Sequence, residues 1–119
     1  MSAVEAYRVT GDWRHLVDDS LADLDDLPDI ALPSGRVEFR VLSPQVARVD
    51  GTAYTFAPVT ASVLRGRMDL WLVGRVGDET IRWAADTHLQ YQGREIPMPS
   101  VEFDLQSDLR FTELMEDAA

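Results

Sequence analysis

Apolar and polar residues alternate with a period of two through most of the chain after residue 36. In the first such stretch, Val37, Phe39 and Val41 alternate with Glu38 and Arg40. Because successive side chains of a β-strand point to opposite faces, this pattern predicts a strand with one buried face. Further alternating stretches have their apolar positions at Val59, Ala61 and Val63, at Met68, Leu70 and Leu72, at Ile81, Trp83 and Ala85, and at Val101, Phe103 and Leu105.

Turn signals separate these stretches. Asp50-Gly51 lies between Val46–Val49 and Thr52–Phe56, and Asp-Gly is typical of a type I′ hairpin turn, whose two central residues need positive φ. The chain has 119 residues, which is the usual size of one domain. We therefore expect a single, mostly β domain, folded as an antiparallel β-sandwich or small barrel of about seven strands. The residues expected to meet in its core are Phe39, Leu70, Trp83 and Phe103.

Residues 12–29 have a different composition, with seven aspartates and a single arginine. Apolar residues recur there at helical spacing, which predicts a short amphipathic helix over Trp13–Leu27. Aspartate, however, is a poor helix former and favours turns. The alternative is an ordered extended arm that packs Trp13, Leu16 and Val17 on the core.

Two prolines, Pro28 and Pro33, separate this acidic segment from the alternating region. The residue before a proline favours extended backbone, so both positions mark a boundary. We therefore place an acidic N-terminal arm or short helix at residues 1–33 and the β-sandwich at residues 34–115. We expect a chain that starts near Leu32 to assemble more weakly while its sandwich stays folded.

The formal net charge of the chain is −10, from 21 acidic residues and 11 arginines. Nucleic-acid binding normally needs a basic face, and an anionic membrane surface repels such a chain. We therefore expect neither nucleic acid nor membrane as a partner. A basic partner, a cation or plain solubility would each account for the charge. The first residues show no basic start followed by an apolar run, so no targeting segment is expected.

Residues suited to metal binding or catalysis are sparse. The chain has no cysteine, which excludes disulfides, thiolate metal sites and cysteine catalysis. His15 and His88 lie far apart, and a zinc site needs three or four ligands. Asp23 and Asp25 imitate the start of an EF-hand loop, but Leu27 occupies the third ligand position. With no serine in a nucleophile elbow either, we expect no enzyme, no cofactor and no bound metal.

Aromatic residues offer another kind of site. Trp71, Trp83 and Tyr91 could form a platform on which a sugar ring stacks. Trp83 shares a strand face with Ile81, which favours the core for its indole. Trp71 is out of phase with the apolar positions of its strand, so it faces solvent, a neighbouring subunit or the opposite layer. For these aromatic residues we favour packing in the core or between subunits over ligand binding.

Several short sequences resemble a known domain when they are taken in order. They are Leu-Val-Asp-Asp-Ser followed by Asp23, Asp25 and Pro28-Asp29, then Pro33-Ser-Gly-Arg-Val-Glu-Phe-Arg, Pro58-Val-Thr-Ala-Ser-Val-Leu, Gly66-x-Met-x-Leu, Trp83, Leu89-Gln-Tyr-Gln-Gly and Val101-Glu-Phe-Asp-Leu. From about Val9 to Leu114 the chain resembles a small β-sandwich domain in virion proteins of tailed phages that infect actinobacteria. This domain often lies at the amino end of minor tail or fibre proteins.

The resemblance implies a virion attachment module, a rigid sandwich that docks to a tail or capsid and often oligomerises. It supplies no catalytic residues. Family members usually continue into collagen-like or fibre segments, whereas this sequence stops at Ala119. That difference suggests a stand-alone virion protein, assembled in the host cytoplasm.

We therefore expect a structural virion protein of a tailed phage, a tail-tip or minor tail attachment module. Its partners would be other virion proteins and further copies of itself. The alternatives are a capsid decoration protein, a carbohydrate-binding module for host-surface glycans, and a small inhibitor whose acidic surface mimics nucleic acid. The candidate partner-binding residues are Asp18, Asp19, Asp23, Asp25, Asp26, Trp71 and Tyr91.

Overall fold

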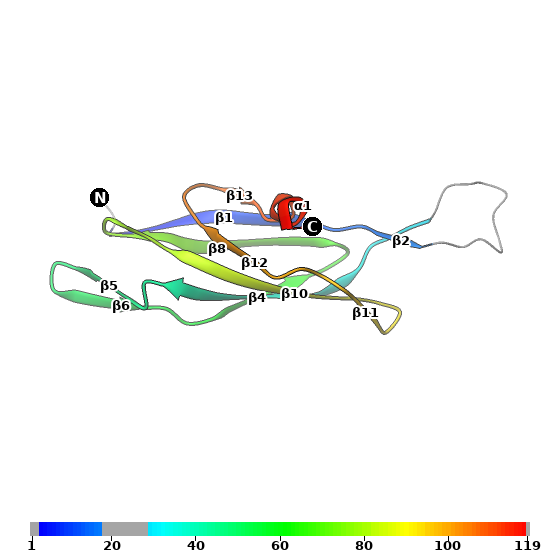
Figure 1. Cartoon of the computed structure of the whole chain (residues 1–119), viewed down its shortest axis with the longest axis horizontal. Coiled ribbons are helices and arrows are strands. Elements are labelled where there is room, and N and C mark those ends of the chain that lie inside the picture. The colour runs from blue at the N-terminus through cyan, green and yellow to red at the C-terminus, as the bar shows by residue number, and fades with distance from the viewer. Residues whose placement is uncertain (1–2, 18–28, 119) are drawn as a thin grey trace.

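The computed structural model describes residues 3–17 and 29–118 of the chain. Strands make up most of these residues, and the one helix among them is the short α1 (Glu113–Ala118). Two layers of sheet lie over one another along the long axis of the molecule (Figure 1). The mostly β fold that the alternating pattern predicts is confirmed.

The first sheet contains β13 (Leu109–Arg110), β1 (Val4–Asp12), β8 (Arg67–Val76) and β9 (Glu79–Thr80), in that order. β1 and β8 are antiparallel over the whole length of β1, with a bulge between Glu5 and Ala6. β13 pairs in parallel with β1 through Val9↔Leu109 and Thr10↔Arg110. The short β13 and β9 therefore flank a long two-stranded centre.

The second sheet contains β11 (Arg94–Ile96), β10 (Arg82–Tyr91), β4 (Ser34–Ser43) and β7 (Val59–Val63), in that order. β12 (Val101–Asp104) also pairs with β10, and with β11 it occupies the side of β10 that faces away from β4. The turn residues Arg65 and Gly66 have φ angles of 52° and 76°. This turn leads from β7 into β8 and so joins the two sheets.

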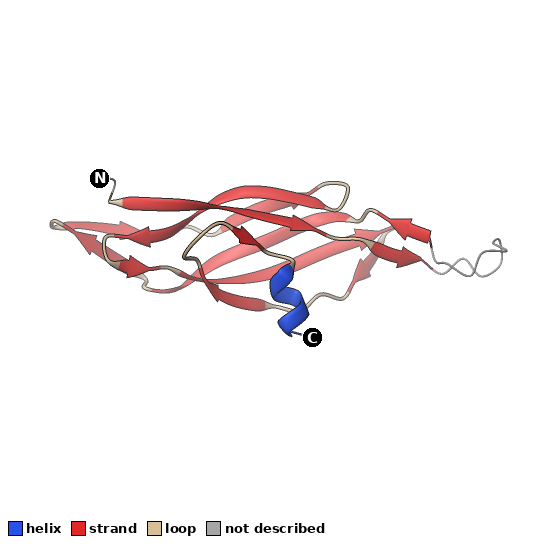
Figure 2. Cartoon of the chain, turned by 90° about the horizontal axis from the view of Figure 1, so that it is seen from above, coloured by secondary structure: helices blue, strands red, loops and turns tan. Residues whose placement is uncertain are grey.

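Two small two-stranded elements extend from opposite ends of this sandwich (Figure 2). One is the hairpin of β5 (Val46–Val49) and β6 (Thr52–Thr55), whose turn residues Asp50 and Gly51 have φ angles of 50° and 81°. These values confirm the predicted type I′ turn. The other element, which we call the ribbon, consists of β2 (His15–Val17) and β3 (Asp29–Ala31).

Aromatic side chains from different elements meet in the core between the sheets. The ring centroids of Phe39 and Phe103 are 6.4 Å apart, and the ring of Phe111 lies 5.5 Å from Phe39 and 6.0 Å from Phe103. Trp83 is also buried, and its Nε1 donates a hydrogen bond to the Val73 carbonyl oxygen at 2.8 Å, which links the second sheet to the first. With Leu70 at the margin, the four residues predicted for the core share one cluster.

The helix predicted over Trp13–Leu27 is wrong for the residues that the structure describes. The Trp13 amide donates a hydrogen bond to the Gly66 carbonyl oxygen at 2.7 Å, and β2 pairs with β3. These backbone groups therefore bond to distant parts of the chain instead of to a helical turn. The remainder of the predicted helix, residues 18–27, lies outside the described residues.

The boundary predicted at residue 33 is also wrong, because β1 is a full strand of the first sheet. Val9, at its middle, is completely buried in the core. Removing residues 1–31 would take away the partner of β8 and uncover that core. A chain that starts near Leu32 would therefore lose its fold, contrary to the expectation from composition.

Candidate functional site

The structure describes two of the seven candidate partner-binding residues. Asp18, Asp19, Asp23, Asp25 and Asp26 lie outside the described residues. Trp71 lies in the middle of β8 in the first sheet, and Tyr91 ends β10 in the second. With Trp83 buried in the core, the three-membered aromatic platform considered from the sequence does not form.

Trp71 lies on the outer face of the first sheet, with 64 % of its surface exposed. Its direct neighbour across the ladder is Arg8 of β1. Arg8 makes a bidentate contact with Asp69, in which Nε donates to Oδ1 at 2.9 Å and Nη2 donates to Oδ2. Hydrogen bonding to Arg8 lowers the pKa of Asp69, and the same bond raises the pKa of Arg8. An exposed indole thus lies beside a geometrically fixed ion pair.

The ribbon carries apolar side chains on a face that no other described element covers. Leu16 and Ile30 are direct cross-strand partners, and they are 62 % and 59 % exposed. Leu32, just beyond β3, is 50 % exposed. The extended arm that the sequence offered as the alternative to a helix is right for Trp13, which is buried in the core cluster. It is wrong for Leu16, because the strand turns His15 and Val17 inward and Leu16 outward.

The root of the ribbon, where Trp13 precedes β2 and Pro33 follows β3, is hydrogen-bonded to the turn between β7 and β8. Trp13 donates to the Gly66 carbonyl, and the Gly66 amide donates to the Pro33 carbonyl oxygen at 2.7 Å. Gly66 has a positive φ of 76°, and a Cβ added there would lie 2.3 Å from the Trp13 carbonyl oxygen. The position therefore requires glycine, because only a residue without Cβ allows this close approach.

A groove of about 570 Å³ opens at the same end of the sandwich, between the inward face of the ribbon and the hairpin of β10 and β11. We call it the end groove. The His15 and Tyr91 rings meet across it, with centroids 5.6 Å apart and planes tilted by 52°. Its lining is completed by Val17, Gln92, Arg94, Glu95, Ile96 and Pro97.

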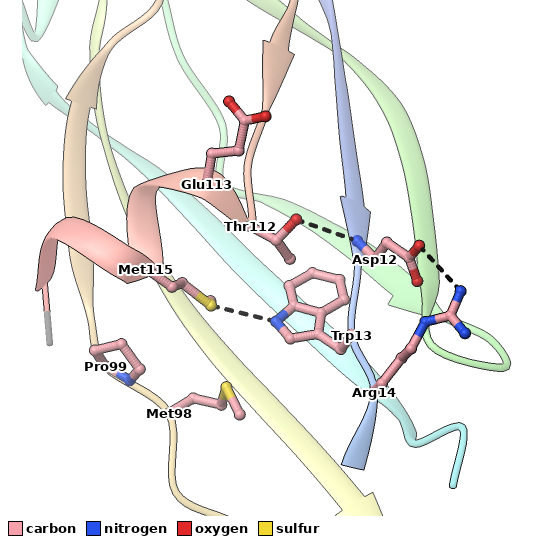
Figure 3. A pocket seen from close by; sticks show the side chains of 8 residues that line it. All are labelled: Asp12, Trp13, Arg14, Met98, Pro99, Thr112, Glu113 and Met115. Atoms are coloured by element: carbon pink, nitrogen blue, oxygen red, sulfur yellow. Dashed lines mark hydrogen bonds and ion pairs between the residues drawn. The ribbon is translucent and has the colours of Figure 1, made fainter. Parts of the chain in front are cut away.

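A second hollow, of about 520 Å³, lies where α1 meets the root of the ribbon (Figure 3). The Trp13 Nε1 donates to the Met115 sulfur at 3.2 Å, and Met98 and Pro99 line the hollow from the connection between β11 and β12. Thioether side chains adapt easily to the shape of a neighbour. The rest of the lining is polar or charged and consists of Asp12, Arg14, Thr112 and Glu113, so an apolar wall and a polar wall meet in this hollow.

Groups able to hold a metal are scattered in the described part of the chain. No cluster of three or more histidine, aspartate or glutamate side chains that could hold an ion occurs there. The His88 Nε2 is 3.6 Å from the Glu38 Oε2, and the His88 Nδ1 is 3.9 Å from the Glu95 Oε1. The other histidine, His15, lies in the ribbon. The helix α1 is too short to cross a membrane, and the described residues contain no other helix that is long and apolar enough to do so.

Comparison of the chain with protein-family models, with curated proteins and with solved structures found no match.

Proposed function

We propose that this chain is a structural module that works through protein–protein assembly, as a tail-tip or minor tail attachment protein in the virion of a tailed phage. The observation that carries the assembly role is the exposed Leu16–Ile30 face of the ribbon. The phage assignment is supported by the sequence motifs described above.

A two-stranded ribbon is marginally stable in water unless another layer covers one of its faces. The inward face of this ribbon rests near the hairpin of β10 and β11, as the His15–Tyr91 contact shows. Its outward face presents Leu16, Ile30 and Leu32 to solvent. Covering each of these side chains is worth up to about 1.5–3 kcal/mol, so a partner surface would stabilise the ribbon substantially. Contiguous exposed apolar residues of this kind mark interaction sites.

The sequence beside the ribbon indicates the charge of its partner. Residues 18–28, which join the two strands, contain five aspartates and no arginine, and the chain as a whole has a net charge of −10. Complementary charge at an interface accelerates encounter and excludes wrong partners. A virion protein with an apolar patch and an arginine- or lysine-rich rim is therefore the partner that fits.

Trp71 offers a second contact surface. Tryptophan and arginine are the residue types most often found at the energetic centre of an interface. The bidentate contact with Asp69 fixes Arg8 beside Trp71, so little side-chain entropy is lost when a partner covers both. A module that is contacted by neighbours on two sides can be built into a ring or a shaft, with further copies of itself among the neighbours.

The test is the double variant Leu16→Asp/Ile30→Asp, with Val46→Asp as its control. Val46 is an exposed apolar residue of the other two-stranded element, at the opposite end of the sandwich. Sedimentation velocity would be measured for the chain alone and mixed with each structural protein encoded beside it. We expect the wild type and Val46→Asp to form a complex and the double variant to stay monomeric.

Circular dichroism must show that all three proteins keep the same strand content. The proposal fails if the wild type stays monomeric in every mixture. It also fails if the double variant assembles as well as the control.

A further inference from the structure

The end groove has a chemistry that differs from the rest of this acidic molecule. One wall is the inward face of β2, where His15 and Val17 occupy alternate positions. The other wall is the hairpin of β10 and β11, in which Tyr91 and Arg94 are direct cross-strand partners. Val17 and Ile96 of the lining are half-buried, whereas Gln92 and Arg94 are exposed, and such a mixture of apolar and polar groups is usual in a small-ligand site.

The rings of His15 and Tyr91 meet at an angle and form a corner. Their planes are tilted by 52° at a centroid separation of 5.6 Å, so they are not stacked face to face. Both side chains are half-buried and keep part of their surface in the groove. A flat apolar ligand face of the size of a sugar ring can therefore rest on one ring while its edge contacts the other.

Polar groups suited to hydroxyls surround this corner. Gln92 donates from Nε2 to the Tyr91 hydroxyl at 3.3 Å, which keeps an amide oxygen and a phenol within reach of a ligand. Arg94 makes no ion pair with any other described residue. The Glu95 carboxylate lies on the other face of the hairpin, where its Oε1 is 3.9 Å from the His88 Nδ1. The groove thus combines donors and acceptors with aromatic faces.

We propose that the end groove binds a neutral pyranose, the terminal sugar of a glycan. A volume of about 570 Å³ lies within the range of small-molecule sites and accommodates one or two sugar rings. The hydroxyls of a pyranose match the amide of Gln92 and the guanidinium of Arg94, and its apolar C–H face matches Tyr91. The net charge of −10 repels anions, which selects a neutral sugar over an acidic one. The site uses His15 as the partner of Tyr91 and does not involve Trp71.

The test is a titration followed by two-dimensional ¹⁵N NMR of the full chain. The probes are the methyl pyranosides of glucose, galactose, mannose and N-acetylglucosamine, with glucuronic acid as the acidic comparison. We expect at least one neutral pyranoside to shift the amides of residues 15–17 and 91–96 and to leave β5 and β6 unchanged. Glucuronic acid should bind more weakly than that pyranoside.

Three variants separate stacking from general disturbance of the hairpin. Tyr91→Ala should weaken binding about tenfold or more, because the ring face is lost. Tyr91→Phe keeps the ring and should lose less than about threefold, and Gln90→Ala, an exposed neighbour outside the groove lining, should bind as the wild type does. The spectrum of each free variant shows whether it is folded.

The inference is overturned if none of the neutral pyranosides shifts the groove amides, if glucuronic acid binds more tightly, or if Tyr91→Ala binds like the wild type. None of these results bears on assembly through the ribbon, because the titration is carried out on the monomer and the outward face of the ribbon is not involved.

Discussion

The body of the sandwich and its ribbon use the same alternating strand chemistry with opposite results. In the body, each strand turns its apolar positions toward a second layer, and Phe39, Phe103 and Phe111 are shielded from water. In the ribbon, Leu16 and Ile30 are paired across the ladder just as regularly, yet no described element covers them. Alternation specifies which side chains share a face, whereas a second layer decides whether that face is buried.

The body and the ribbon therefore have different sources of stability. The body is stabilised by its own core, because large aromatic groups from the second sheet and from the C-terminal segment meet there. The ribbon is held to the body mainly at its root, through Gly66, and by the contact of His15 with Tyr91. Its outer face gains stability only when a partner covers it.

The largest expected effect is the loss of a core ring. Phe39→Ala should destabilise the chain by about 3–5 kcal/mol, because it removes a fully buried ring and leaves a cavity between the sheets. Leu16→Ala should change the free energy of unfolding by less than about 0.5 kcal/mol, as exposed substitutions do. Urea unfolding of both variants measures this difference. Equal losses would show that the ribbon belongs to the same packed core as the body.

The junction between body and ribbon should be the next most sensitive point. Gly66→Ala should cost about 2 kcal/mol or more, because the new Cβ would meet the Trp13 carbonyl oxygen in addition to the strain of a positive φ. Gly51→Ala is the matched control, since Gly51 has a φ of 81° but no atom within 4 Å of its would-be Cβ. Thermal unfolding of the two variants isolates the contact at the ribbon root. A larger loss in Gly51→Ala would contradict this account of the junction.

A smaller change in the free energy of unfolding is expected when a buried polar atom of the body is replaced. The Thr87 Oγ1 is buried and has no hydrogen-bond partner among the described residues. Thr87→Val replaces this hydroxyl with a methyl group of similar shape, so we expect stabilisation of about 1 kcal/mol. Thr60→Val, at an exposed position of β7 in the same sheet, is the control and should stay near zero. Destabilisation by Thr87→Val would show that the hydroxyl is satisfied in solution.

The smallest effect concerns the exposed pair on the outer face of the first sheet. Arg8 lowers the pKa of Asp69 below its ordinary value of 3.8, so the folded state releases that proton more readily than the unfolded chain. The contribution of the pair is therefore present above the unfolded pKa and is lost as the pH falls through the folded one. Asp69→Asn should be slightly less stable than the wild type near neutral pH and equally stable in strong acid. Urea midpoints at the two pH values, with added salt reducing the difference, provide the measurement.

The sequence was informative where a residue pattern repeats and turn residues punctuate it. The alternation at Val37, Phe39 and Val41 predicted β4, and Asp50-Gly51 predicted the hairpin between β5 and β6. β1 was missed because its bulge at Glu5–Ala6 interrupts the period of two. α1 is too short to show a helical period.

The ribbon and the end groove could not be predicted for a different reason. Aspartates next to Leu16 and Val17 suggested caps or turns, and only the pairing with residues 29–31, more than ten positions away, makes that segment a strand. The groove depends on the same pairing, because it brings His15 to Tyr91 from distant parts of the sequence. For Trp71, by contrast, the phase within β8 predicted a side chain turned away from the apolar face of its strand, and the structure shows that it is exposed rather than covered by the opposite layer.

Residue-resolved hydrogen exchange on the isolated monomer tests most directly whether the body stabilises itself while the ribbon depends on a partner. We predict that backbone amides in the paired centres of β4, β8 and β10 exchange only through global unfolding, and that those of β2 and β3 exchange at least about a hundredfold faster through local opening. Addition of the assembly partner should slow exchange in β2 and β3 and leave the body unchanged. Ribbon amides as protected in the monomer as those of β4 would show that the ribbon is stable without a partner.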